Sequence, residues 1–303
     1  MKADMNLVKL VEQFGSEAKC RDYLEALRWP NGPICPKCGA VTVSRIKVRG
    51  QFDCNACRHQ FSVTAGTIFH DSHLPVWKWF LAAYMMVEAK KGISANQIKR
   101  IIGTSYKTAW YLCHRIRAAM TETNPELLGG TVEADETYVG GKRRSGRGNR
   151  SHKSVVMGVV ERGGKIRLKS GGAHKDVYRE LAHEFLRRHA RPDTKRLMTD
   201  ESHLYKYFAD HDTTHHTVKH GENQWVGGDV HTNTVESVWS LLKRSIVGSY
   251  HKVSVKHLDA YLDELEWRFN NRRNPYLFRE TVRKLLDSPN LSYARLVSTI
   301  KGA

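Results

Sequence analysis

Two Cys-x-x-Cys pairs constrain this chain more than any other feature. Cys35 and Cys38 form the first pair, Cys54 and Cys57 form the second, and fifteen residues separate the pairs. That spacing is typical of a zinc ribbon, because each short turn brings two thiolates toward one tetrahedral ion. We therefore predict one structural Zn²⁺ held by these four cysteines. Disulfides are the alternative, and the reducing compartment that we expect for this chain disfavours them.

Helices are predicted on both sides of the ribbon. Apolar residues recur at helical spacing over 6–28 and in three segments between 75 and 120. The second and third of these segments meet at a turn near Gly103 and resemble a helix-turn-helix, with an ordinary three-helix bundle as the alternative. Cys20 and Cys113 fall within these helical patterns, so we expect them in the core rather than at a metal.

The charge of the chain predicts a polyanionic partner. Lys and Arg outnumber Asp and Glu by 49 to 31, for a net charge of +18, and nucleic acid is the first candidate. A basic protein with no such partner is the alternative. The last of the three predicted helices between 75 and 120 would enter the major groove. The glycine-rich basic run 140–150 would bind phosphates, with a solvated linker as the alternative. Together these segments predict DNA contacts at Lys107, Thr108, Arg115, Lys142, Arg143, Arg144, Arg147 and Arg150.

Three acids mark a second candidate metal site. Asp135 lies in the predicted strand 131–139, Asp200 follows the predicted strand 196–199, and Glu236 lies on the amphipathic helix that begins near His231. Sixty-four residues separate the first two acids and thirty-five separate the last two. Carboxylates brought together from two strand ends and one helix suit a pair of Mg²⁺ or Mn²⁺ ions for phosphoryl transfer.

Each acid also has a structural alternative. Asp200 can cap the helix predicted after it, and Asn233 with Glu236 matches a capping box in which the amide is the cap. Strand alternation predicts that Glu133 shares a face with Asp135, whereas Glu136 points away from that face. If all three acids had only structural roles, their fit to one catalytic arrangement would be a coincidence. We therefore favour a metal site.

The order of elements indicates an α/β fold of the ribonuclease H-like type. Strands are predicted at 131–139, 154–160, 165–169, 196–199 and 216–219, and helices at 175–190, 202–209 and from 231 onward. In that fold the first acid lies on the first strand and the second acid follows the fourth strand. Asp135 and Asp200 occupy those positions, and Glu236 falls on the closing helix.

From about Leu24 to Leu286 the chain resembles bacterial insertion-sequence transposases that join a zinc ribbon to a DDE catalytic domain. The matching stretches are 28–30 with the ribbon, 107–110, 114–117, 135–142, 199–200, 231–244 and 269–272. The resemblance implies hydrolysis at the 3′ ends of a mobile DNA element and transfer of the freed 3′-OH strands into target DNA. It also implies that Asp135, Asp200 and Glu236 are the catalytic acids, with Lys243 as the accompanying base and Arg244 on the DNA.

Several alternatives stay open beside this resemblance. Some members of the family use an amide as the third ligand, so Asn233 remains a rival to Glu236. A non-catalytic DNA-binding regulator descended from a transposase is a second hypothesis, and a ribonuclease H-like nuclease without strand transfer is a third. We expect double-stranded DNA, as terminal repeats and target, to be the partner, and a homo-oligomer to assemble on it.

The organisation that we predict has five segments. No apolar run approaches the length of about 20 residues that a membrane helix needs, and the N-terminus has no apolar signal core. We therefore expect no membrane partner and a cytoplasmic bacterial protein that is nucleoid-associated when bound. The first segment is helical and covers residues 1–33. It is followed by the zinc ribbon 34–64, the helix-turn-helix-like region 65–125, the catalytic domain 126–250 and the C-terminal helices 251–303.

Overall fold

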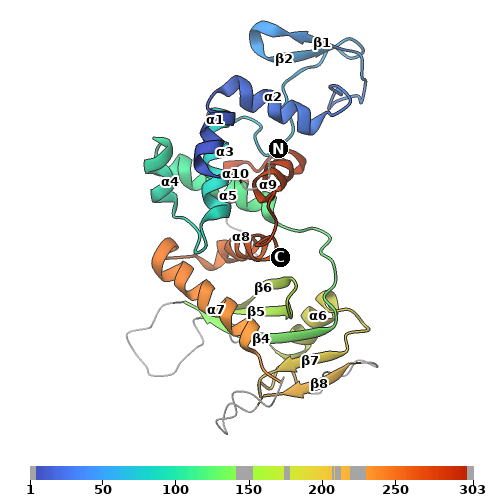
Figure 1. Cartoon of the computed structure of the whole chain (residues 1–303), viewed down its shortest axis with the longest axis vertical. Helices are drawn as coiled ribbons and strands as arrows, with labels where there is room; N and C mark the ends of the chain where they lie inside the picture. Colours follow the sequence, from blue (N-terminus) through green and yellow to red (C-terminus); the bar gives the residue numbers. More distant parts are fainter. Residues whose placement is uncertain are drawn as a thin grey trace. The chain divides into compact units, whose positions relative to one another are not determined.

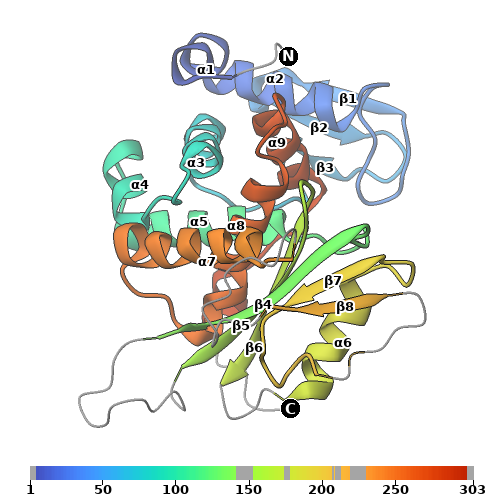
Figure 2. The ribbon, with the colours of Figure 1, turned by 60° about the horizontal axis from the view of Figure 1, so that its bottom comes forward.

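The chain divides into two compact units. The computed structural model describes residues 5–140, 153–173, 178–206, 208, 213–218 and 230–298. Unit 1 combines Met1–Met120 with Arg273–Ala303, and unit 2 is Thr121–Arg272 (Figure 1, Figure 2). Across the described ranges, no helix has both the length and the apolar character needed to cross a membrane. The five-segment division rests on sequence alone and stays a prediction.

Unit 1 begins with two helices in the segment before the ribbon for which helical structure was predicted. They are α1 (Leu7–Phe14) and α2 (Glu17–Arg28), and the chain turns between them at Gly15. Each helix begins with a side-chain cap, because the side chains of Asn6 and Ser16 accept a backbone N–H from the first turn. These caps satisfy donors that a helix start otherwise leaves without a partner.

The ribbon is a three-stranded antiparallel sheet. Its strands are β1 (Val43–Ile46), β2 (Gln51–Cys54) and β3 (Gln60–Phe61), in the order β1-β2-β3. A 3-10 turn over Lys47–Arg49 joins the first two strands and ends at Gly50, whose φ of 58° is left-handed. A glycine accepts that conformation without a Cβ clash, which allows the chain to turn sharply between the two strands.

Three helices follow the ribbon, as the sequence predicts. They are α3 (Val76–Glu88), α4 (Ala95–Ile102) and α5 (Tyr106–Met120). Ser94 caps α4, and Gly103, with a φ of 60°, ends it and allows the sharp turn into α5. The pair α4 and α5 packs together as a helix-turn-helix-like unit.

The end of the chain completes the core of unit 1. Two more helices, α9 (Leu277–Asp287) and α10 (Tyr293–Val297), belong to this unit, and α9 packs against α2, α3 and α5. The ring of Phe278 on α9 lies 5.7 Å from the ring of Phe80 and 6.0 Å from that of Phe14. The N-terminal helices therefore share one aromatic core with a helix from the other end of the chain.

Unit 2 is built on a five-stranded mixed sheet. Its strands are β4 (Thr131–Val139), β5 (Ser154–Glu161), β6 (Ile166–Ala173), β7 (Arg196–Thr199) and β8 (Thr214–Thr217). The spatial order is β6-β5-β4-β7-β8. The pairs β6–β5 and β5–β4 are antiparallel, whereas β4–β7 and β7–β8 are parallel. This is the ribonuclease H-like arrangement predicted from the element order.

Helices cover both faces of this sheet (Figure 2). They are α6 (Arg179–His189), α7 (Asn233–Ser245) and α8 (Leu258–Asn270). On β5, Val155 and Met157 belong to the core that includes α6, and Val156 and Val160 belong to the core that includes α7 and α8. Because β5 is buried on both faces, it reads as a continuous apolar run rather than as an alternating one.

One predicted element is wrong in its described part. A helix was expected over 202–209, but His203–Lys206 form a turn, and residues 207 and 209 lie outside the described residues. The Asp200 carboxylate accepts the backbone N–H of Ser202 at 2.9 Å, and the N–H of Tyr205 bonds to the Ser202 carbonyl three residues back. Such local bonds compete with the helical pattern. Other boundaries differ by a few residues, with β6 longer and α6 shorter than predicted.

Candidate functional site

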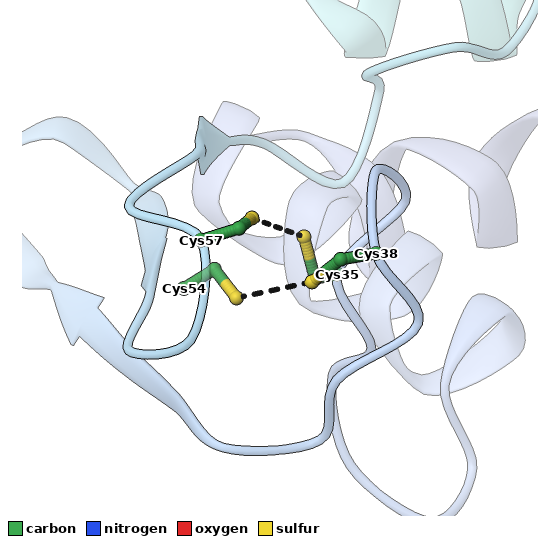
Figure 3. A group of neighbouring side chains, drawn as sticks. All are labelled: Cys35, Cys38, Cys54 and Cys57. Atoms are coloured by element: carbon green, nitrogen blue, oxygen red, sulfur yellow. Dashed lines mark hydrogen bonds between the residues drawn. The ribbon is translucent and has the colours of Figure 1, made fainter.

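The four cysteines of the ribbon converge on one point (Figure 3). One sulfur from each residue lies within 4.8 Å of all the others. The Cys35 and Cys57 sulfurs are 3.7 Å apart, and those of Cys38 and Cys54 are 3.5 Å apart. Four thiolates around a tetrahedral zinc with bonds of about 2.3 Å would lie about 3.8 Å from one another. The sulfur geometry therefore fits one zinc ion.

Local backbone bonds shape the two turns that carry these thiols. The N–H of Gly39 bonds to the Cys35 carbonyl, and the N–H of Arg58 bonds to the Cys54 carbonyl. Backbone N–H groups at Cys57 and Ala56 lower the pKa of the Cys54 thiol to about 7. A thiol with a lowered pKa is readily deprotonated, as metal ligation requires.

The second cluster lies where β4 and β7 run side by side. These strands are parallel, and Glu133 pairs with Met198, so Asp135 on β4 is level with Asp200 just beyond the end of β7. One carboxylate oxygen from each of Asp135, Glu136 and Asp200 lies within 4.8 Å of the others. Acids from two strands that are far apart in the sequence thus meet at one edge of the sheet.

Asp135 is held from two sides. Its Oδ1 accepts the N–H of Glu136 at 2.8 Å, and its Oδ2 accepts the indole N–H of Trp239 at 2.8 Å. Burial, followed by the negative charges of Asp200 and Glu136, raises the pKa of Asp135 to about 8. Carboxylates crowded in this way favour a bound cation, which would relieve their mutual repulsion.

Glu136 corrects an interpretation of the sequence. Alternation predicted that it points away from Asp135, yet its carboxylate belongs to the same group. The reason is that β7 ends at Thr199, so Asp200 lies past the strand end, where side chains from both faces of β4 approach it. One oxygen of Glu136 accepts a bond from Ser202 Oγ at 3.0 Å, and its other oxygen, Oε2, is buried.

Glu236 lies on α7 and faces the same cleft as the acidic cluster. It lines a cleft of about 580 Å³ together with Asp135, Glu136 and Asp200. Its carboxylate accepts a hydrogen bond from the Thr232 hydroxyl at 2.8 Å, but it is not a member of the group of three acids. The cleft thus collects the three acids predicted from the sequence and adds a fourth.

The predicted cap of this helix is wrong. Asn233 is exposed and is the first residue of α7 rather than its cap, and Thr232 at the cap position makes no capping bond. The Glu133 carboxylate takes that role, because it accepts the N–H groups of Thr234 at 2.8 Å and Val235 at 3.1 Å. A buried acid from the neighbouring strand satisfies the start of α7 better than a local amide, since its charge also favours the positive end of the helix dipole.

The fully buried Glu133 has further partners. Arg162 Nε donates to its Oε1 at 2.7 Å, and Arg162 also donates to the carbonyl of His231 at 2.7 Å. As predicted, Glu133 and Asp135 share the face of β4 that meets α7. In the sequence Glu133 is one of three acids in the strand 131–139, and nothing there marks it as the partner of a helix that begins a hundred residues later.

The predicted basic residues are found in three different settings. Lys243 and Arg244 are exposed on α7 and line the cleft that holds the acids. Lys107 is exposed and Thr108 half-buried in the first turn of α5. Arg115 is only 2% exposed and donates to the carbonyls of Ile68 and His70, so its side chain is part of the core. The remaining predicted contacts, Lys142, Arg143, Arg144, Arg147 and Arg150, lie outside the described residues.

In comparisons with known proteins, the cysteine cluster and the acidic cluster each fall within a match to a transposase domain. Residues 127–270 match a family described as an ISXO2-like transposase domain, and residues 15–60 match a transposase zinc-ribbon domain. A protein of transposable element ISH50 from Halobacterium salinarum is 30% identical over 300 residues, which cover 92% of this chain and 98% of that protein.

Two solved structures were also found, at a lower level of similarity. The Mos1 strand transfer complex and a pre-cleavage Mos1 transpososome each align with 69% of this chain and 75% of theirs, at 10% identity and a TM-score of 0.29. A likeness that weak carries no argument about this chain.

Proposed function

Because this chain belongs to the insertion-sequence DDE transposases with an N-terminal zinc ribbon, we propose that it cleaves and joins DNA. In this proposal it binds the ends of a mobile element, hydrolyses at the 3′ ends and transfers the 3′-OH strands into target DNA. The observation that carries it is the cleft in which Asp135, Asp200 and Glu236 gather beside Lys243 and Arg244.

The acids fit a pair of divalent ions. All the ligand atoms on offer are carboxylate oxygens, which Mg²⁺ and Mn²⁺ prefer, and the acids are half-buried. Asp135, Asp200 and Glu236 would hold these ions. Such ions activate an attacking oxygen and stabilise a leaving oxygen. The Glu136 carboxylate, which lies in the same group of acids, offers a further ligand atom beside Asp200.

The basic residues of α7 have a separate task. Lys243 and Arg244 project from the last turns of the helix into the same cleft. Their charges would hold the phosphate backbone of the scissile strand against the acids, and Lys243 would accompany the reaction as the family base. Both side chains are exposed, and Arg244 Nε also donates to the Ser240 carbonyl of the same helix at 3.2 Å.

Unit 1 is proposed to bind zinc and to read DNA. The ribbon would hold one structural Zn²⁺ through Cys35, Cys38, Cys54 and Cys57, whose sulfur spacing fits that ion. Lys107 and Thr108 would contact DNA from α5, and the basic residues of 142–150 would add phosphate contacts from unit 2. Arg115 is left out, since its guanidinium is committed to backbone carbonyls. Assembly as a homo-oligomer on DNA, in the cell's nucleoid, completes the proposal.

One reaction mixture tests the activity. Purified protein is incubated with labelled candidate terminal repeats, an unlabelled target plasmid and Mg²⁺. Joined products support transposition, nicks alone would indicate a nuclease, and a shifted but intact band would indicate a DNA-binding regulator. The matched control is Glu184→Gln, which neutralises an exposed acid on α6 and should leave joining unchanged, whereas Asp200→Asn should abolish it.

A further inference from the structure

The contact between α7 and β4 includes a bond that the family comparison does not assign. The indole of Trp239 is 4% exposed and donates its N–H to Asp135 Oδ2 at 2.8 Å. The other oxygen of Asp135 accepts the backbone N–H of Glu136. Each oxygen of a carboxylate can accept two bonds, so both oxygens keep capacity for a metal ion while their directions are already fixed.

A glycine provides the space for this bond. Gly158 on β5 is the residue paired directly with Asp135 across the two strands. A Cβ placed on Gly158 would lie 2.7 Å from Trp239 Cζ2 and closer still to the neighbouring ring carbon, Cη2. Real side chains do not approach so closely, so the ring reaches the carboxylate only because residue 158 has no side chain.

The rest of the ring is fixed by packing. Trp239 belongs to the core formed by β5, β6, α7 and α8, where Val156, Leu168 and Leu242 are also buried. An indole in a dense core has few alternative rotamers, so its N–H is held in one direction. The hydrogen bond is therefore built into the core of unit 2 rather than added by a mobile surface group.

We propose that Trp239 is a positioning residue for metal binding, which orients the Asp135 carboxylate through its indole N–H, with Gly158 as the seat of the ring. This inference rests on the proposed function. Groups that orient a metal ligand typically change metal affinity or activity by about 10–100-fold when they are lost. Trp239 does not touch DNA or metal in this proposal, and it acts only through Asp135.

The direct test is Trp239→Phe, which keeps an aromatic ring in the core and removes the N–H donor. Mn²⁺ binding to the DNA-free, zinc-loaded protein is measured by electron paramagnetic resonance of the free ion. We expect the Mn²⁺ dissociation constant to rise about 10–100-fold, with an unchanged circular dichroism spectrum. The Mg²⁺ concentration for half-maximal strand cleavage should rise in parallel.

The control is Trp79→Phe in unit 1. Trp79 is 1% exposed and its N–H also donates to an oxygen, Ser72 Oγ at 2.9 Å, so the same chemical change is made away from the acids. It should leave the Mn²⁺ affinity unchanged. A Trp239→Phe protein with the affinity of the unaltered protein would overturn the inference.

Two further measurements cover the other outcomes. Gly158→Ala keeps the indole but displaces it, and it should weaken Mn²⁺ binding in the same direction. If neither variant folds, hydrogen exchange of the Trp239 indole in the unaltered protein decides, because exchange as fast as that of the partly exposed Trp77 would overturn the bond. Tight Mn²⁺ binding without any DNA cleavage would defeat the proposed function and leave this inference standing.

Discussion

The two candidate metal sites of this chain are assembled in opposite ways. The thiols of the ribbon come from two short turns within 23 residues of sequence, from Cys35 to Cys57. The carboxylates come from β4, from the end of β7 and from α7, which only the sheet of unit 2 brings together. We therefore expect the ribbon to depend on a bound ion for its shape, and the acidic cleft to depend on the fold of unit 2 rather than on an ion.

The two sites also differ in how the fold shifts the pKa values of their candidate ligands. Backbone N–H groups lower the pKa of the Cys54 thiol to about 7. At Cys38 a backbone hydrogen bond at Ala40 is outweighed by the neighbouring thiols of Cys57 and Cys54, which raise the pKa to about 12. Burial and neighbouring acids raise the pKa of Asp135, so the ionised form of this carboxylate is disfavoured when no cation is bound. One ion is expected to build structure, and the other is expected to relieve a strain that the structure imposes.

The largest effect that we expect is the loss of the ribbon fold when zinc is removed. Removing zinc, or changing Cys38→Ser, should unfold the ribbon, because structural zinc contributes about 10–16 kcal/mol of apparent binding free energy in zinc-finger peptides. Proteolysis within 34–64 should accelerate while unit 2 stays resistant, and metal analysis should fall from one zinc per chain to none. A ribbon that stays protected without zinc would contradict the assignment.

The next effect concerns catalysis rather than folding. Asp135→Asn, Asp200→Asn and Glu236→Gln should each reduce single-turnover cleavage of a labelled terminal repeat by about 10⁴-fold, since groups that act as one unit fail together. Circular dichroism and DNA affinity should change little. A variant of Glu236 that cuts normally, beside an inactive Asn233→Ala, would give the third ligand position to Asn233.

A smaller loss of stability is expected at the base of α7. Glu133→Gln keeps the shape of the side chain but removes the charge that faces the helix start and Arg162. We expect a loss of about 1.5–3 kcal/mol in the free energy of unfolding, the range for hydrogen bonds to charged groups. Urea denaturation measures it. The exposed Glu184→Gln should change stability by less than about 0.5 kcal/mol, and an equal effect of both would remove the role of Glu133.

The pH dependence of metal binding sharpens the electrostatic contrast. The folded protein raises the pKa of Asp135 to about 8, from about 3.9 for a free Asp. In the metal-free protein, protonation of Asp135 therefore contributes fully to the free energy of unfolding only below about pH 4. That contribution is lost as the pH rises through about 8. Mg²⁺ should therefore raise the melting temperature more at pH 8.5 than at pH 6, by about 2–4 °C per kcal/mol of binding free energy. Asp135→Asn should flatten this difference, and an unchanged difference would contradict the origin assigned to it.

The smallest effect that we expect is the change in stability when Asn233 is replaced, which tests whether this residue caps α7. The sequence favoured Asn233 as the cap, for which Asn233→Ala would cost about 1 kcal/mol. Because Asn233 is exposed and Glu133 satisfies the helix start, we now expect a change within about 0.5 kcal/mol by urea denaturation. A loss near 1 kcal/mol would show that the amide contributes to the cap after all.

Features that depend on nearby residues were predictable from the sequence. The strands 131–139 and 196–199 each reflect a few neighbouring residues, and the structure confirms them. The cysteine spacing is equally local, and the four sulfurs converge as it predicts. The positions of the three acids relative to one another followed from the family resemblance and the element order, and the cleft brings these acids together.

Features that depend on distant residues were not predictable. Glu136 joins the acids because β7 stops at Thr199, and a strand end is poorly defined by local preference. Glu133 caps a helix that lies about a hundred residues later in the chain, and Arg115 is drawn inward by carbonyls near residue 70. A periodic pattern reports which face a residue occupies, but not which distant group it will meet there.

The return of the chain to unit 1 has a consequence for the order of folding during translation. Unit 2 is a contiguous segment inserted between Met120 and Arg273, so it can fold once about 270 residues have left the ribosome. Unit 1 has to wait for α9, because Phe278 completes the aromatic core around Phe14 and Phe80. Nascent domains generally fold as units in the order in which they are completed. The half that is synthesised first is therefore the half that is finished last, and until then its apolar helices need protection from aggregation.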